Sequence, residues 1–174
     1  MENLDDVNIQ DEAPKRPNFL VFLLVLTSIS LVLMLYSTVQ GLIEGPKSPE
    51  FMEELLAEQS EQIAEAKSVL GEDGMLMEAI ESSMELAKYQ NNEVFYSYHI
   101  WTFLQVLLGI AAVVFMFKLR KIGFHLYVAY SVLPIIISYL LFPLAYLSNF
   151  MIFGSILIAG LFCLLYGLNL KHMK

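Results

Sequence analysis

The feature that most constrains this chain is a set of four long stretches that contain no charged residue. They are 21, 24, 26 and 21 residues long and cover residues 19–39, 94–117, 122–147 and 150–170. A helix rises about 1.5 Å per residue, so about 20 apolar residues cross the ~30 Å hydrocarbon core of a bilayer. Buried helices of soluble proteins are usually shorter. The pattern predicts an all-α integral membrane protein with four transmembrane helices, at residues 19–43, 94–117, 122–147 and 150–170.

The composition argues against several other classes of protein. Hydrophobic residues make up 57% of the chain and charged residues 16%, against about 45–50% and about 25% in soluble domains. A soluble enzyme is therefore not expected. The net charge of −8 argues against nucleic-acid binding. The single cysteine, Cys163, excludes an internal disulfide and a metal site built from several cysteines.

The basic residues predict how the four helices are oriented. They cluster before the first stretch (Lys15 and Arg16), between the second and third (118–121) and after the fourth (171–174). Cytoplasmic loops carry an excess of Lys and Arg, and these three clusters can all lie on one side. We therefore expect a multi-pass protein of the cell membrane with both termini in the cytoplasm. Residues 1–18 would form an acidic cytoplasmic tail leading into an uncleaved anchor.

The segment 44–93 is predicted to lie on the other side as an acidic helical hairpin. It holds 13 of the 18 acidic residues. Ser48 followed by Pro49 is typical of a helix start, and apolar residues then recur at helical spacing. Gly71 suits a helix end, and residues 72–74 suit a turn. We expect two helices of about 22 and 16 residues, roughly 33 and 24 Å long, that stand off the membrane.

This extracytoplasmic hairpin is the candidate recognition surface. It either packs on itself and on the transmembrane helices, or presents a methionine-rich apolar face to a partner. Its negative charge would attract basic partners and bind divalent cations weakly. The residues assigned to a partner surface are Glu58, Glu61, Glu65, Met77 and Met84.

No Asp, Glu, Lys or Arg lies within the four stretches, and no acid–base pair, nucleophile or metal-ligand pattern is visible. We therefore expect no enzyme activity and no cofactor. Small and weakly polar residues instead recur at helical spacing, which favours close helix packing in lipid. The predicted packing residues are Thr27, Ser30, Gly109, Ala112, Ser155, Ala159, Cys163 and Gly167. Gln105 and Pro134 are the alternative markers of a polar pocket, because Pro134 frees the backbone carbonyl of Tyr130.

Three short basic and aromatic segments, at residues 15–17, 121–127 and 166–173, carry a resemblance to known proteins. The chain resembles small four-span inner-membrane proteins of unknown function in bacteria. The resemblance implies a bacterial inner-membrane location and brings no catalytic or binding residue with it.

Two functions follow as hypotheses. The first is an interaction or accessory subunit, embedded in the lipid bilayer, whose acidic hairpin recognises a protein partner or a second copy of the chain. The alternative is a small-solute transporter or channel with a polar path near Gln105 and Pro134. A polar cavity that reaches Gln105 would favour the second, and a dry bundle would favour the first.

Overall fold

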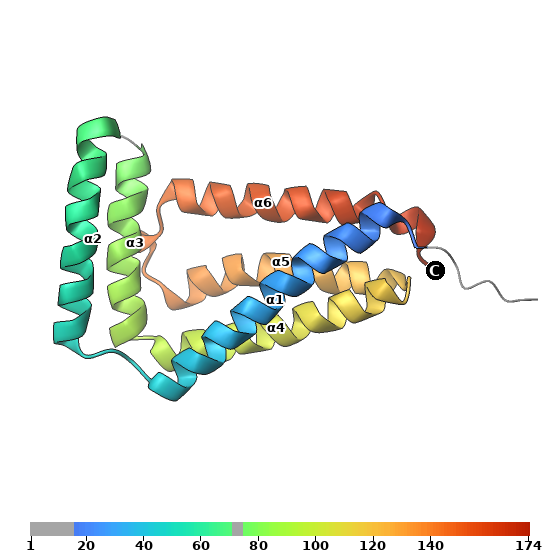
Figure 1. Ribbon diagram of the computed structural model, residues 1–174, viewed down its shortest axis with the longest axis horizontal. Helices are drawn as coiled ribbons and strands as arrows, with labels where there is room; N and C mark the ends of the chain where they lie inside the picture. The colour runs from blue at the N-terminus through green and yellow to red at the C-terminus, as the bar shows by residue number, and fades with distance from the viewer. Residues whose placement is uncertain (1–15, 71–74) are drawn as a thin grey trace, which may run out of the picture.

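The computed structural model describes residues 16–70 and 75–174. Within these residues the chain is all-helical, which confirms the all-α part of the predicted fold class (Figure 1). The α-helices are α1 (Asn18–Glu44), α2 (Pro49–Leu70), α3 (Met75–Asn92), α4 (Phe95–Phe117), α5 (Lys121–Leu141) and α6 (Asn149–Gly167), with short 3-10 helices η1 (Leu144–Tyr146) and η2 (Leu170–His172). Four helices are long and apolar enough to cross a membrane: α1, α4, α5 and α6 continued by η2.

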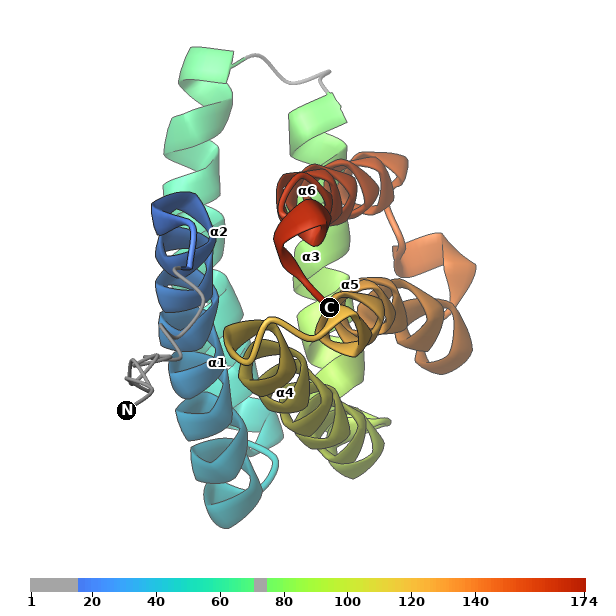
Figure 2. The same cartoon turned by 90° about the vertical axis from the view of Figure 1, so that its right-hand side faces the viewer.

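These four long helices form a bundle in which each packs on the next in an open row. α1 packs on α4, α4 on α5, and α5 on α6. Figure 2 looks along the bundle and shows α1 and α6 at the two ends of this row. In Figure 1, α1 crosses the front of the bundle diagonally, so it diverges from α6 along its length. The row therefore does not close into a ring, and one side of the bundle, between α1 and α6, stays open.

α5 ends at Leu141, six residues before the end of the uncharged stretch 122–147. Phe142 has an extended backbone, with φ −111° and ψ 142°. Pro143 follows it, and a proline disfavours helical backbone at the residue before it. The next helix, α6, begins after Ser148, whose side chain accepts a hydrogen bond of 3.2 Å from the backbone N–H of Phe150. Residues 142–148 therefore form a connection and not the last turns of a helix.

α2 and α3 lie side by side across one end of the bundle, with α3 between α2 and the long helices (Figure 1). The predicted start of α2 is confirmed: the helix begins at Pro49, and Ser48 Oγ accepts a 3.3 Å hydrogen bond from the Phe51 N–H. The predicted helix end at Gly71 and turn at 72–74 lie outside the described residues. The pair crosses the bundle end and does not project from it, which differs from our expectation.

Aromatic and amide contacts hold the α2/α3 pair in this position. The ring of Tyr89 on α3 lies 6.2 Å from that of Phe142 and 5.6 Å from that of Tyr146. Asn91, which is buried, joins α3 to the backbone of Lys47 in the α1–α2 connection. Its Oδ1 accepts from the Lys47 N–H at 2.8 Å, and its Nδ2 donates to the Lys47 carbonyl at 2.9 Å. We call this end of the bundle the α3 end.

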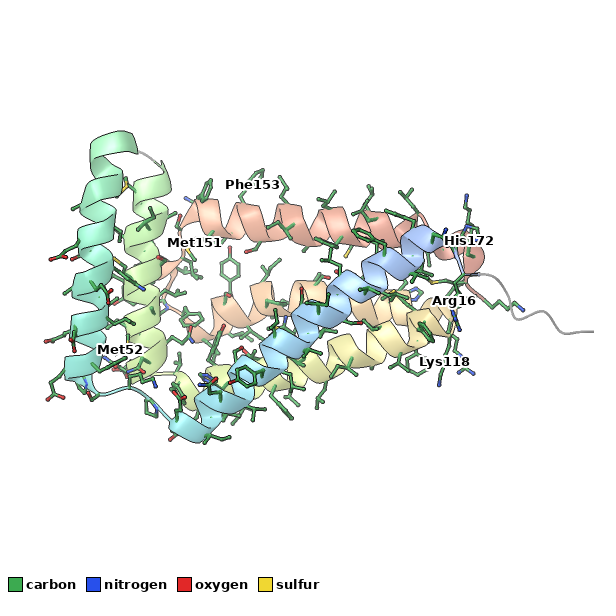
Figure 3. The ribbon with its side chains drawn as sticks, viewed as in Figure 1. Arg16, Met52, Lys118, Met151, Phe153 and His172 are labelled. Carbon is green, nitrogen blue, oxygen red and sulfur yellow. The ribbon has the colours of Figure 1, made fainter. Side chains whose placement is uncertain are left out.

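The opposite end, which we call the basic end, carries most of the positive charges of the described residues and the buried core cluster. Figure 3 places Arg16, Lys118 and His172 together there. The guanidinium of Arg16 lies 4.0 Å from the ring centroid of Phe117 and donates to its backbone carbonyl. A buried cluster from all four long helices and the adjoining turns lies beneath, made of Leu20, Leu23, Leu24, Ala112, Met116, Leu119, Tyr127, Tyr166 and Met173.

Candidate functional site

A cavity of about 390 Å³ lies between α1 and α6, with α4 and α5 as its back wall. We call it the α1/α6 cleft. Its polar lining consists of Thr27, Ser30, Gln105, Tyr127, Tyr130, Ser131 and Ser155, and the rest of its lining of Leu26, Pro134, Ile135, Ile158, Ala159 and Phe162. None of these described residues is charged. Hydroxyl and amide groups of this kind can hydrogen-bond an uncharged molecule but cannot neutralise an ion.

Gln105 is the most informative residue of the cleft. Its side chain is 6% exposed. Within the described part of the chain, no side-chain hydrogen bond of Gln105 is found. Every fully enclosed side-chain nitrogen or oxygen in that part has a partner, so the Gln105 amide must face open space. It borders both the cleft and a second cavity of about 270 Å³ on the side of the α3 end. The residue as a whole is therefore buried, but its amide is unpaired and accessible from the cavity space.

Pro134 removes one helical hydrogen bond beside Gln105. Proline has no N–H, so the helical hydrogen bond to the carbonyl of Tyr130 cannot form. The Ser138 hydroxyl donates to the Pro134 carbonyl at 2.9 Å. Tyr130 and Pro134 line both cavities, as Gln105 does. The junction of the two cavities therefore combines an amide, a phenol and a residue, Tyr130, whose backbone carbonyl lacks its usual helical partner.

The cleft is closed toward the basic end. Thr27 Oγ1 on α1 and the Tyr166 hydroxyl on α6 form a 2.7 Å hydrogen bond that bridges the two helices. The rings of Tyr127 and Tyr166 lie 4.4 Å apart between centroids. Tyr166 is completely buried, and the core cluster of the basic end continues below it.

An aromatic group and α3 close the opposite end. Tyr98, at the start of α4, borders the second cavity and lies 6.0 Å from the ring of Phe142. Phe142 is buried and contacts Tyr89 of α3, which crosses above it. Figure 1 shows α3 lying over the ends of α4, α5 and α6 at this point. Access along the bundle axis is therefore blocked at both ends.

The side between α1 and α6 is open. These helices are joined by the Thr27–Tyr166 hydrogen bond but do not pack along their lengths. Ser30 and Ser155 line the cleft and are exposed. Leu26 and Ile158 also line it and are 40% and 58% exposed. The cleft is therefore a lateral opening with polar groups inside and a mixed rim.

The predicted site residues divide between this cleft and the helix interfaces. Thr27, Ser30, Ser155 and Ala159, predicted as packing residues, line the cleft together with Gln105 and Pro134. Gly109 and Ala112 are instead buried on α4 against its neighbours. Cys163 is half-buried beside the core cluster, and Gly167 is half-buried near Phe124. Half of the predicted packing residues thus share one cavity with the two predicted polar-pocket residues.

Sequence reasoning did not single out Tyr127 and Tyr130, which line the cleft from α5. It also missed Gly123, whose position against α4 permits close packing. A signal was present, because Tyr127, Tyr130 and Pro134 are spaced three and four residues apart. This spacing places them on one face of a helix.

The predicted partner surface on α2 and α3 is only partly exposed. Met77 is 2% exposed, so it belongs to the interior of the pair. Met84 is half-buried beside Tyr146. Glu58 and Glu61 are exposed, and the side chain of Glu65 lies outside the described residues. In the described chain, no group of three or more His, Cys, Asp or Glu side chains could hold a metal ion.

No protein-family model, curated protein or solved structure matches the chain.

Proposed function

We propose that the chain is a four-span integral membrane protein of the bacterial inner membrane. Its basic end faces the cytoplasm, because six Lys and Arg residues of the described part of the chain lie there and flank the long helices. The α2/α3 pair then lies on the extracytoplasmic surface, parallel to the bilayer, with α3 nearer to the lipid. In this orientation the α1/α6 cleft opens toward the hydrocarbon layer.

We propose further that the protein binds a small uncharged molecule in the α1/α6 cleft, as a carrier or receptor and not as an enzyme. The observation that carries this proposal is the unpaired amide of Gln105, a residue that is 6% exposed and borders the cleft. In a cleft without water, leaving such a group unsatisfied costs about 1–3 kcal/mol. A molecule that pairs with the amide recovers this free energy on binding. A cavity that reaches Gln105 also favours the small-solute hypothesis over the interaction-subunit hypothesis, which expects a bundle without a polar cavity.

The test uses one variant that fills the cleft and one matched control on the same helix. Ala159→Phe places a ring in the cavity that Ala159 lines. Gly160→Phe adds the same ring on a face with open space around it. Each protein is purified in mild detergent, and its small-molecule content is measured by mass spectrometry. We expect a compound that co-purifies with the wild type and with Gly160→Phe, and about tenfold less of it with Ala159→Phe, which corresponds to about 1.4 kcal/mol.

The same small-molecule profile in all three proteins would contradict binding in the cleft. Gln105→Leu gives a second measurement that does not depend on a bulky ring. Leucine is apolar and leaves no unpaired group, so the variant should fold but lose the compound.

A second candidate function is that of an interaction or accessory subunit. It is favoured by the exposed carboxylates of Glu58 and Glu61 on α2, and by the contacts of Tyr89 and Asn91 that hold the pair against the bundle. Such a surface suits a basic protein partner, and binds divalent cations weakly because exposed charges are screened over about 8 Å. Exchanging Glu53, Glu58 and Glu61 together for Gln should remove co-purifying proteins. An unchanged set of partners would contradict this role.

A further inference from the structure

We propose that the α1/α6 cleft binds the uncharged, oxygen-bearing head of a lipid-soluble molecule, which enters sideways from the bilayer and leaves its apolar tail between α1 and α6. This inference rests on the proposed binding function and names the class of ligand. Four features of the cleft carry it: its route of access, its polarity, the shape of its walls and its size.

The route of access indicates a ligand that is dissolved in the membrane. The Thr27–Tyr166 bridge and the core close the basic end. Tyr98, Phe142 and the overlying α3 close the other end. The open side, with Ser30 and Ser155 exposed at its rim, faces the hydrocarbon layer in the proposed orientation. A water-soluble molecule would have to cross lipid to reach this opening, whereas a lipid-soluble one meets it by lateral diffusion.

The polarity of the lining sets the chemistry of the head. A charged head, such as a phosphate, would leave water without meeting an opposite charge, which costs several kcal/mol per ion. An uncharged head with carbonyl, ester or hydroxyl oxygens fits better. Its oxygens would accept hydrogen bonds from the Gln105 amide and from the Tyr130 hydroxyl. A hydroxyl on the head would also donate to the carbonyl of Tyr130, whose usual helical donor is missing at Pro134.

The walls and the size of the cleft favour a compact head with its tail outside. The rings of Tyr127, Tyr130 and Phe162 line the cavity, and aromatic faces pack well on flat or compact apolar groups. A volume of about 390 Å³ accommodates a head group but not a complete lipid. Leu26 and Ile158 at the rim are exposed, so an apolar tail could leave the cleft along them.

Two sources of such a head are distinguished by the probes. One is a neutral glycerolipid, for which dioctanoylglycerol is the probe, and the other is a prenylated quinone, for which a decyl-tailed benzoquinone is the probe. Dioctanoyl phosphatidylglycerol is the charged comparison, and glycerol is the water-soluble one. Each is added to the purified full chain in detergent, and the melting temperature is measured.

We expect dioctanoylglycerol or the benzoquinone to raise the melting temperature by about 5 °C at a concentration a hundredfold above Kd. The rise should persist in Gly160→Phe. It should disappear in Ala159→Phe, and Gln105→Leu should need about tenfold more ligand for the same rise. The probe that acts identifies the source. Helical content and elution volume of each variant show whether it is folded.

Other outcomes overturn the inference in distinguishable ways. If glycerol stabilises the wild type but not Gln105→Leu, while neither neutral lipid does, the cleft binds a ligand but not of this class. If phosphatidylglycerol acts as strongly as the neutral lipids, an uncharged head is not required. If no probe acts and no compound co-purifies with the wild type, the proposed binding function fails as well.

Discussion

Gly123 lies where α5 approaches α4 most closely at the basic end. A Cβ at this position would lie 2.4 Å from the backbone nitrogen of Met116 and 2.9 Å from the backbone oxygen of Ala112. Backbone atoms cannot move aside as a flexible side chain can. We therefore expect Gly123→Ala to separate the two helices and lower the free energy of unfolding by about 1–3 kcal/mol. Thermal unfolding in mild detergent measures this loss.

Gly160 provides the matched control for Gly123→Ala. It also lies in a long helix, but a Cβ there meets no atom within 4 Å. Alanine favours helix over glycine by about 1 kcal/mol, so Gly160→Ala should leave the melting temperature unchanged or raise it. A loss of stability of equal size in both variants would show that close packing at Gly123 is not the cause.

The bridge between Thr27 and Tyr166 is the direct link from α1 to α6. Its 2.7 Å hydrogen bond joins two buried side chains. Interhelical hydrogen bonds in membranes contribute about 0.6 kcal/mol on average and up to about 1.7 kcal/mol. A double-mutant cycle with Thr27→Val and Tyr166→Phe should give a coupling energy in this range. Strictly additive effects of the two substitutions on unfolding would argue against the bridge.

At the scale of elements, Asn91 fixes where the α2/α3 pair sits. Its amide makes two hydrogen bonds with the backbone of Lys47 and is buried. Asn91→Ala leaves both backbone groups without their partner, which costs about 1–3 kcal/mol for each buried group that stays unsatisfied. We expect faster hydrogen exchange in α2 while the exchange in α4 is unchanged. Gln59→Ala, at an exposed position of α2, should leave hydrogen exchange in both α2 and α4 unchanged. Unchanged exchange in α2 of Asn91→Ala, or faster exchange in α4, would contradict the role of Asn91.

The sequence predicted the elements well where a local signal exists. Pro49 marked the start of α2, and uncharged length marked the four long helices. The early end of α5 had a local signal too, in Pro143, but uncharged length alone placed the end at Leu147. Gln105 and Pro134 were recognisable as polar markers one at a time. Gln105 and Pro134 line one cavity with Ser30 because α1 crosses the bundle diagonally. The spacing of residues within one helix does not predict how helices cross.

For the whole molecule, the distribution of charge predicts its orientation in the membrane. The basic end carries Arg16, Lys118 and His172 (Figure 3), and the exposed acidic residues of α2 belong to the pair that crosses the other end. Lys171 directly precedes His172 in the chain. With Cys163 replaced by Ala, Ser60→Cys on α2 and Lys171→Cys each place one thiol at an exposed position. A membrane-impermeant maleimide added to intact cells should label Ser60→Cys at once, and Lys171→Cys only after the membrane is opened, because positive residues stay in the cytoplasm. The reverse order of labelling would invert the orientation, and equal labelling of both in intact cells would contradict a membrane-spanning bundle.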